Sequence, residues 1–302
     1  MLKDIEFADA ICYSGFRDGQ SPDSGIFPSK SEIKEDLLML EKHWKYLRLY
    51  DCDPHAKTVL EVIEEENLDL RVMLGAYILA EENNSNCPWG GTYQAEELEA
   101  NRRKNDQRIK DLIGLAKAYP QTIFSLSVGN EAAVEWTDHL VSVDRIVEFV
   151  KEVKRHCDQP VTFCENYLPW LTKLQALAKV VDFISIHTYP VWEYKGIEEG
   201  IGYTLENYYA VKNLYPEKEV VITEAGWATN SNGRGIDPQN VNEEFQKIYV
   251  QQLLEWSRKE EVLTFVFEAF DERWKGSDEE LEPEKHWGLF YTDRSPKLLM
   301  QS

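Results

Sequence analysis

Two segments of the sequence each end an apolar run with a glutamate. They are Ser127-Val128-Gly129-Asn130-Glu131 and Ile222-Thr223-Glu224-Ala225-Gly226-Trp227. A pair of carboxyl groups can cleave a glycosidic bond when one donates a proton to the leaving oxygen and the other, ionised, attacks the sugar or activates water. The two carboxyls then need environments that separate their pKa values. Asn130, directly before Glu131, adds an amide that could donate to a sugar 2-hydroxyl.

The elements that must position these residues alternate between short β-rich runs and longer amphipathic stretches. Runs such as Val220-Val221-Ile222 are apolar on both faces, which is typical of parallel strands covered by helices. A capping-box pattern at Ser29-Lys30-Ser31-Glu32 predicts a helix that follows it. We expect strands over residues 8–13, 46–50, 70–76, 123–128, 161–164, 183–187, 220–223 and 264–268. We expect further helices over 96–118, 143–155 and 243–258, the first of which buries Leu98, Ile109, Leu112, Ile113 and Ala116.

Eight strand-then-helix units within 302 residues match the size of a (β/α)8 TIM barrel, an α/β fold. No linker, composition break or internal repeat divides the chain, so we expect a single catalytic domain over residues 1–302. Functional side chains of such barrels lie at the C-terminal ends of the strands. Glu131 and Glu224 follow the fourth and seventh strands and would therefore share one rim. Either glutamate alone would more often be a solvated strand-end residue, but the pair favours catalysis.

The remaining strand ends are rich in aromatic and polar residues. Sugars have apolar C–H faces and hydroxyl edges, so a sugar-binding cleft combines flat aromatic side chains with short polar groups. Tryptophans expected near the rim are Trp136, Trp170, Trp192, Trp227 and Trp274; some of them could instead pack loops onto helices. Further candidate substrate-binding residues at strand ends are Tyr13, Tyr50, Asp51, Tyr167, Tyr189, Glu268, Glu272 and Lys275.

The charge balance argues against several partners. The chain has 33 Lys and Arg residues against 54 Asp and Glu residues, a formal net charge of −21. This field repels a phosphate backbone or an anionic membrane surface, so we expect a neutral or cationic ligand, with no nucleic acid and no membrane partner. The five cysteines form no CxxC pair, which leaves a zinc ribbon or a dithiol centre without support. No signal-like apolar stretch occurs; if a leader was removed, a periplasmic or secreted location is favoured.

At these residues the sequence resembles glycoside hydrolase family 17, the β-1,3-glucanases and related glucanosyltransferases. The similarity runs along nearly the whole chain, and the order of the motifs on successive strands is more specific than any one motif. The run from Tyr13 to Asp23 resembles the bacterial branch, whereas Glu268 and Cys164-Glu165-Asn166-Tyr167 depart from the plant pattern. The motifs are Ile11-Cys12-Tyr13-Ser14-Gly15, Leu47-Arg48-Leu49-Tyr50, Val128-Gly129-Asn130-Glu131, Thr223-Glu224-Ala225-Gly226-Trp227, Phe270-Asp271-Glu272-Arg273-Trp274-Lys275 and Trp287-Gly288-Leu289-Phe290.

The resemblance implies a retaining mechanism on β-1,3-linked glucan. We expect an endo-acting, monomeric enzyme that hydrolyses laminarin-type glucan and needs no cofactor or metal. Glu131 would be the acid/base and Glu224 the nucleophile, and Tyr189 would hydrogen-bond the nucleophile. Three residues match family positions that bind the glucose next to the cleaved bond: Glu272, Lys275 and Glu284.

Three alternatives stay open from the sequence. A β-1,3-glucanosyltransferase would use the same site and pass the glycosyl group to a sugar acceptor. A metal-dependent hydrolase could gather Asp51, Asp53, His55 and His187, although no HxH or HExxH spacing occurs. A non-catalytic glucan-binding protein is disfavoured because both carboxyl residues are present.

Overall fold

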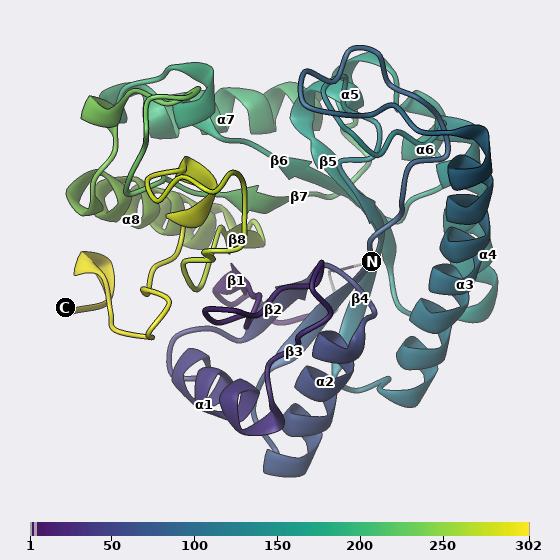
Figure 1. Ribbon diagram of the computed structural model, residues 1–302, viewed down its shortest axis with the longest axis horizontal. Helices are drawn as coiled ribbons and strands as arrows, with labels where there is room; N and C mark the ends of the chain where they lie inside the picture. The colour runs from purple at the N-terminus through teal and green to yellow at the C-terminus, as the bar shows by residue number, and fades with distance from the viewer. Residues whose placement is uncertain (1, 3–4, 302) are drawn as a thin grey trace.

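Eight parallel strands close into a barrel in which each strand pairs with its neighbours in sequence order and β8 pairs with β1 (Figure 1). The computed structural model describes Leu2 and residues 5–301, so residues 1, 3, 4 and 302 of the expected domain lie outside the described part. The strands are β1 (Ala10–Cys12), β2 (Tyr46–Leu49), β3 (Arg71–Ala76), β4 (Ile123–Asn130), β5 (Val161–Asn166), β6 (Ile184–His187), β7 (Val220–Ala225) and β8 (Thr264–Val266). The prediction of a TIM barrel is confirmed.

Helices surround the barrel and connect successive strands (Figure 1). The longer ones are α1 (Lys30–Leu40), α2 (Pro54–Glu66), α3 (Ala95–Ala118), α4 (Val143–His156), α7 (Ile197–Leu214) and α8 (Glu243–Glu260). Two short helices, α5 (Tyr167–Thr172) and α6 (Gln175–Ala178), lie between β5 and β6. Short 3-10 turns are η2 (Pro190–Glu193), η3 (Pro238–Asn240), η4 (Pro283–Lys285) and η5 (Leu298–Gln301). In the part of the chain that the structure describes, no helix has the length and apolar character needed to cross a membrane.

Local sequence signals account for several helix starts. Ser29 caps α1 and forms the predicted capping box with Glu32. The buried face predicted for α3 is only partly right: Ile109, Leu112 and Ala116 are buried, whereas Leu98 and Ile113 are partly exposed. Two asparagines of α3 take buried places there, because their side chains hydrogen-bond the loop after β3; these are Asn101 and Asn105.

The strands that carry the two glutamates run further than their apolar patterns predict. β4 continues to Asn130 and β7 to Ala225, so Glu224 lies inside its strand and Glu131 follows directly after β4. Gly226 permits this geometry, because a Cβ atom there would come within 2.0 Å of the Phe267 carbonyl oxygen. Both glutamates are thereby placed at the C-terminal rim.

Candidate active site

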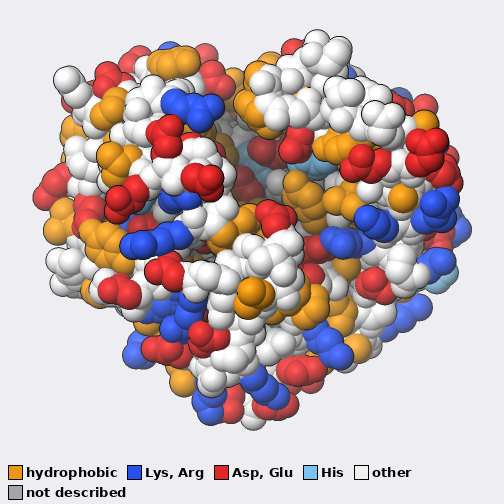
Figure 2. Space-filling view, viewed as in Figure 1, with side chains coloured by type: hydrophobic (Ala, Val, Ile, Leu, Met, Phe, Trp, Pro, Cys, Tyr) orange, Lys and Arg blue, Asp and Glu red, His pale blue; other side chains and the backbone are white. Residues whose placement is uncertain are grey.

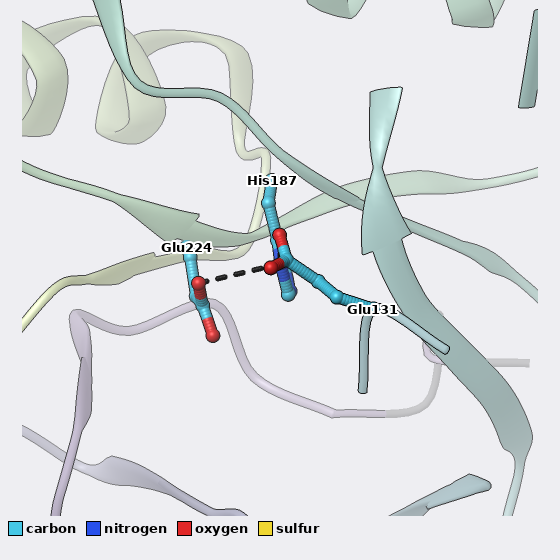
Figure 3. Close-up of side chains that lie close together, drawn as sticks. All are labelled: Glu131, His187 and Glu224. Atoms are coloured by element: carbon cyan, nitrogen blue, oxygen red, sulfur yellow. Dashed lines mark hydrogen bonds and ion pairs between the residues drawn. The ribbon is translucent and has the colours of Figure 1, made fainter. Parts of the chain in front are cut away.

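Glu131 and Glu224 reach the same point of the rim from β4 and β7 (Figure 3). One carboxyl oxygen of Glu131 and one of Glu224 lie within 4.8 Å of each other. His187, at the end of β6, contacts both: its Nδ1 is 2.8 Å from Glu131 Oε1 and 3.3 Å from Glu224 Oε2. A register shift after Ile186 pairs His187 with Glu224 across the β6–β7 ladder. The fold thus brings two residues that are far apart in sequence into one constellation.

Glu224 is a buried carboxylate surrounded by hydrogen-bond donors. Arg48 donates to its Oε1 and Tyr189 donates to its Oε2. Burial acts to raise the pKa of Glu224, but the charges of His187 and Arg48, together with these hydrogen bonds, lower the pKa to about 2. Glu224 is therefore ionised at neutral and mildly acidic pH, which is the state that a nucleophilic carboxylate needs.

Glu131 occupies a more open position on a fixed backbone. Its side chain is 28% exposed, against 6% for Glu224. Its φ of 47° is left-handed, and Gly129 has a φ of 92° at a place where a Cβ atom would meet the Phe163 ring at 2.8 Å. The Glu131 N–H donates to the Cys164 carbonyl oxygen at 2.9 Å. The carboxyl can therefore meet a group that enters from solvent, while its backbone is held by β5.

A buried carboxyl on β5, Glu165, fixes the loop that follows Glu131. Its Oε2 accepts hydrogen bonds from the backbone N–H groups of Ala133 (2.9 Å) and Val134 (3.1 Å). Burial and the nearby charge of Glu131 raise the pKa of Glu165 to about 8. We infer that Glu165, which departs from the plant pattern, orders the loop beside the rim.

A second charged cluster lies on the β8 side of the rim. Lys275 Nζ is 2.7 Å from Glu268 Oε2 and 2.5 Å from Glu272 Oε2. Ser14 and Trp274 both donate to Glu272 Oε1, Trp274 from its Nε1 at 2.8 Å. These contacts gather three other residues predicted to bind substrate, Glu268, Glu272 and Trp274, around the half-buried Lys275 ammonium group.

The carboxyl groups around Lys275 differ in the direction in which their pKa values are shifted. Burial raises the pKa of Glu268 well above its usual range, against the attraction of Lys275. Burial acts on Glu272 in the same direction, but the charge of Lys275 lowers the pKa of Glu272. Burial also raises the pKa of Glu284 to about 7, opposed by Lys275 and reinforced by the two rim carboxylates. The surroundings thus favour the ionised form of Glu272 beside Lys275 and disfavour the ionised form of Glu268.

The surface above this region is hollowed. Figure 2 shows a hollow between two lobes, with acidic and histidine side chains inside it. Tyr167 is held by a hydrogen bond of 2.9 Å between its hydroxyl group and that of Tyr203. The predicted aromatic residues that keep some exposure are Tyr50, Trp136, Tyr167, Tyr189, Trp192 and Trp274. Four exposed aromatic residues elsewhere in the described chain were not among those predicted: Trp89 (67%), Tyr194 (80%), Tyr209 (41%) and Tyr291 (41%).

Three predicted aromatic residues are fully buried in contacts within the protein. Trp170 and Trp227 are fully buried, and their Nε1 groups donate to the carbonyl oxygens of Ser185 and Asn240, both at 2.9 Å. Tyr13 is 1% exposed, and its hydroxyl donates to a buried carboxylate. Their burial differs from the exposed position expected for a sugar-binding aromatic, because a strand-end aromatic can also pack under the loops.

Three other predicted binding residues support the rim from below. The Arg48 guanidinium lies 4.3 Å from the centre of the Tyr50 ring and donates to Asn130 Oδ1 at 2.5 Å. Asp51 forms an ion pair with Arg108 and accepts a hydrogen bond from the Tyr77 N–H at 3.1 Å. Tyr50 and Asn130 therefore help to hold Arg48 beside the nucleophile candidate, and Asp51 ties two loops together.

The loop that carries Ser14 is anchored by a buried ion-pair network. Arg294, near the C-terminus, binds Asp36 on α1 through two hydrogen bonds of 2.8 and 2.7 Å and donates to the Gly15 carbonyl oxygen at 2.9 Å. Asp36 also accepts from Arg17 at 3.1 Å. The C-terminal segment thus helps to fix the β1 loop, including the Ser14 contact to the β8 cluster.

We expect Asp36→Ala to lower the free energy of unfolding by about 3–5 kcal/mol, because it leaves the buried Arg294 charge without its partner. Glu35→Ala is the matched control: it removes an ion pair of Arg17 from a side chain that is 59% exposed, and should cost about 0–1 kcal/mol. Urea denaturation of both variants measures the difference. Equal losses would contradict a special role for the buried network.

Metal binding can be judged from the residues present. Among the described residues, Glu131, His187 and Glu224 form the one group close enough to hold an ion. Both carboxyl oxygens of Glu224 already accept hydrogen bonds, one from Arg48 and one from Tyr189. The Glu224 carboxylate is therefore used for hydrogen bonding in this structure. The alternative metal ligands Asp51, Asp53 and His55 do not form such a group. Asp51 forms an ion pair with Arg108, Asp53 caps the start of α2, and His55 accepts a hydrogen bond from the Gly15 N–H.

Arg48 and His187 were not predicted as glycosidase site residues, and His187 was considered only as a possible metal ligand. Arg48 is a charged residue inside the apolar run of β2, and His187 ends the apolar run of β6. A charged side chain in a strand buried on both faces must find a partner inside the barrel. That signal could have placed Arg48 near an acidic group, but it could not have named Glu224.

An eight-stranded barrel with two carboxyl groups in contrasting surroundings at its C-terminal rim is the architecture of a glycoside hydrolase. Comparison with known families agrees with this class. The BtgE/BtgC glycoside hydrolase domain matches residues 10–288, and the chain belongs to this family.

Individual relatives share the length and fold of the chain. A protein named glucan 1,3-beta-glucosidase from Arthroderma benhamiae is 29% identical over an alignment of 305 residues. The alignment covers 94% of this chain and 88% of the relative. The crystal structure of an endo-laminarinase from Formosa Hel1_33_131 superposes with a TM-score of 0.82 at 25% identity, covering 97% of this chain and 85% of that one. An active-site mutant of a Rhizomucor miehei β-1,3-glucanosyltransferase, in complex with laminaritriose, shares the fold at 19% identity and a TM-score of 0.75, covering 96% and 95%.

Proposed function

We propose that this protein is an endo-acting, retaining β-1,3-glucanase that hydrolyses laminarin-type glucan, and that it is a bacterial-branch member of glycoside hydrolase family 17. The observation that carries the proposal is the approach of a Glu131 oxygen to a Glu224 oxygen within 4.8 Å. Retaining glycosidases hold their two carboxyl groups about 5–5.5 Å apart, whereas inverting ones leave about 6.5–9.5 Å for a water molecule. The short separation favours double displacement.

In the first step, Glu224 attacks the anomeric carbon while Glu131 protonates the glycosidic oxygen. The C–O bond to the leaving sugar breaks, and a bond from the anomeric carbon to a Glu224 oxygen forms. Arg48 and Tyr189 support this role because they keep Glu224 ionised and fix both of its oxygens. The exposure of the Glu131 carboxyl suits proton donation to an entering substrate.

In the second step, Glu131, now a carboxylate, removes a proton from water. The water oxygen bonds to the anomeric carbon, and Glu224 leaves with the electron pair of the ester bond. Two inversions restore the β configuration. We further propose that residues 1–302 act as one catalytic domain, as a monomer.

The choice of β-1,3-glucan rests on several observations. The endo-laminarinase and the glucan 1,3-beta-glucosidase are similar to this chain over most of its length. The partly exposed aromatic side chains suit the flat faces of glucose units, and the net charge of −21 suits a neutral polysaccharide.

Incubation with laminarin and with β-1,3-gluco-oligosaccharides, followed by product sizing, tests the proposal. We expect early products of mixed length from laminarin and no turnover of β-1,4-linked cello-oligosaccharides, which are the matched control. Proton NMR at early times should show a β-anomeric product. An initial α-product would contradict retention, release of glucose alone would contradict endo action, and chains longer than the substrate would indicate a glucanosyltransferase.

A further inference from the structure

One ring nitrogen of His187 faces both candidate catalytic carboxyls (Figure 3). The imidazole is fully buried at the end of β6, and its Nδ1 lies 2.8 Å from Glu131 Oε1 and 3.3 Å from Glu224 Oε2. The Glu131 contact is a hydrogen bond and the Glu224 contact is an ion pair, so a single Nδ1–H group lies close to both carboxyls. Neither the family match nor the similarity to relatives assigns a role to this residue.

The two carboxyls depend on His187 to different extents. Glu224 also accepts hydrogen bonds from Arg48 and Tyr189, so it keeps two donors if His187 is lost. Among the described residues, the only side chain that donates to the Glu131 carboxyl is His187. Removal of His187 should therefore affect the step in which Glu131 carries negative charge more than the step in which Glu224 carries it.

Double displacement moves that charge between the two residues. Before the first step Glu224 is a carboxylate and Glu131 is protonated; after it Glu224 is an ester and Glu131 is a carboxylate. We propose that His187 acts as a shared cationic donor, which balances Glu224 in the free enzyme and Glu131 in the glycosyl-enzyme. His187 is thus a positioning residue that keeps Glu131 ionised as the base of the second step. This role rests on the proposed function.

The surroundings of His187 keep its ring charged. Burial acts to lower the pKa of His187, but the two rim carboxylates and a contact with the Cys164 side chain raise it to about 10. The two neighbouring carboxylates therefore favour the protonated, cationic form of the ring. The charged or titratable groups that act on His187 from the packed strands are Glu131 after β4, Cys164 and Glu165 on β5, and Glu224 on β7. Arg48 on β2 acts on two of them, Cys164 and Glu224.

A substrate that needs no proton for its departure separates the two steps. 2,4-Dinitrophenyl β-laminaribioside forms the glycosyl-enzyme without help from an acid, so its burst phase reports the first step and its steady state the second. For His187→Ala we expect a burst with a rate constant within about threefold of the wild type, followed by a steady-state rate at least about tenfold lower. The acid limb of the steady-state pH profile should move upward by about one pH unit, because the Glu131 carboxylate loses the stabilisation that a neighbouring cation provides.

His187→Asn is the conservative variant, since its amide keeps an N–H close to the position of Nδ1 but carries no charge. It should recover part of the steady-state rate yet show the same shift of the acid limb, and it provides both readouts if the alanine variant does not fold. Equal loss in both phases, or an unmoved acid limb, would overturn the role of His187. If the wild-type enzyme releases no dinitrophenolate, the proposed function fails and the role fails with it.

Discussion

Glu224→Ala is expected to reduce hydrolysis of β-1,3-gluco-oligosaccharides by about 10⁵-fold or more, because loss of a nucleophile removes the covalent route entirely. Glu224 lies within 4.8 Å of Glu131 and is kept ionised by Arg48 and Tyr189, so no other described carboxyl occupies an equivalent place. Oligosaccharide binding, measured by calorimetry, should persist. Initial rates on laminaritetraose give the size of the loss.

Sodium azide tests the chemistry of the same variant. The alanine leaves space on the face of the sugar from which Glu224 attacks, and azide entering that space should give an α-glycosyl azide by a single inversion. Glu217→Ala is the matched control, because Glu217 is exposed in the turn before β7 and should leave the rate unchanged. Turnover of Glu224→Ala at the normal rate would refute the assignment, and a β-azide would place the nucleophile elsewhere.

The barrel and its rim could be predicted because their signals are local. Each strand is a short apolar run between amphipathic stretches, and the capping box of α1 depends on residues three positions apart. A rule of the fold then carries this local information to the site, since all strand ends of a parallel barrel meet at one rim. That rule was enough to bring Glu131 and Glu224 together.

The inner contacts of the site could not be predicted, because they depend on register. The shift after Ile186 pairs His187 with Glu224, and a second shift in the β4–β5 ladder pairs Asn130 with Cys164. No feature of the sequence marks either irregularity. Without them, His187 remains a histidine at a strand end and could as well be a metal ligand.

The direction in which aromatic side chains point could not be predicted from the sequence either. Trp227 and Trp274 both follow strand ends, yet Trp227 packs on Tyr249 under the loops while Trp274 donates to Glu272 at the rim. Which way a loop residue turns depends on the tertiary surface that it meets. Sequence reasoning could therefore predict an aromatic rim but could not select its members.

Glu131→Ala is expected to lower kcat/KM for laminaritetraose by about 10²–10⁴-fold, which is the range that a general acid contributes. The sugar leaving group needs a proton, and the Glu131 carboxyl is the partly exposed acid beside Glu224. For 2,4-dinitrophenyl β-laminaribioside the first step should be nearly unchanged, since dinitrophenolate leaves unprotonated. Comparison of the two substrates under the same conditions measures the dependence on leaving group.

In the second step, Glu131→Ala should give an azide product of opposite configuration to that of the Glu224 variant. Without its base, Glu131→Ala should accumulate the glycosyl-enzyme, and azide should release it as a β-glycosyl azide, because Glu224 still performs the first inversion. Glu135→Ala is the control: Glu135 is exposed in the same loop, four residues beyond Glu131, and should behave as the wild type. A variant equally slow on both substrates would remove Glu131 from proton transfer. The α-azide from the Glu224 variant and the β-azide from this one would together separate the roles of the two carboxyls.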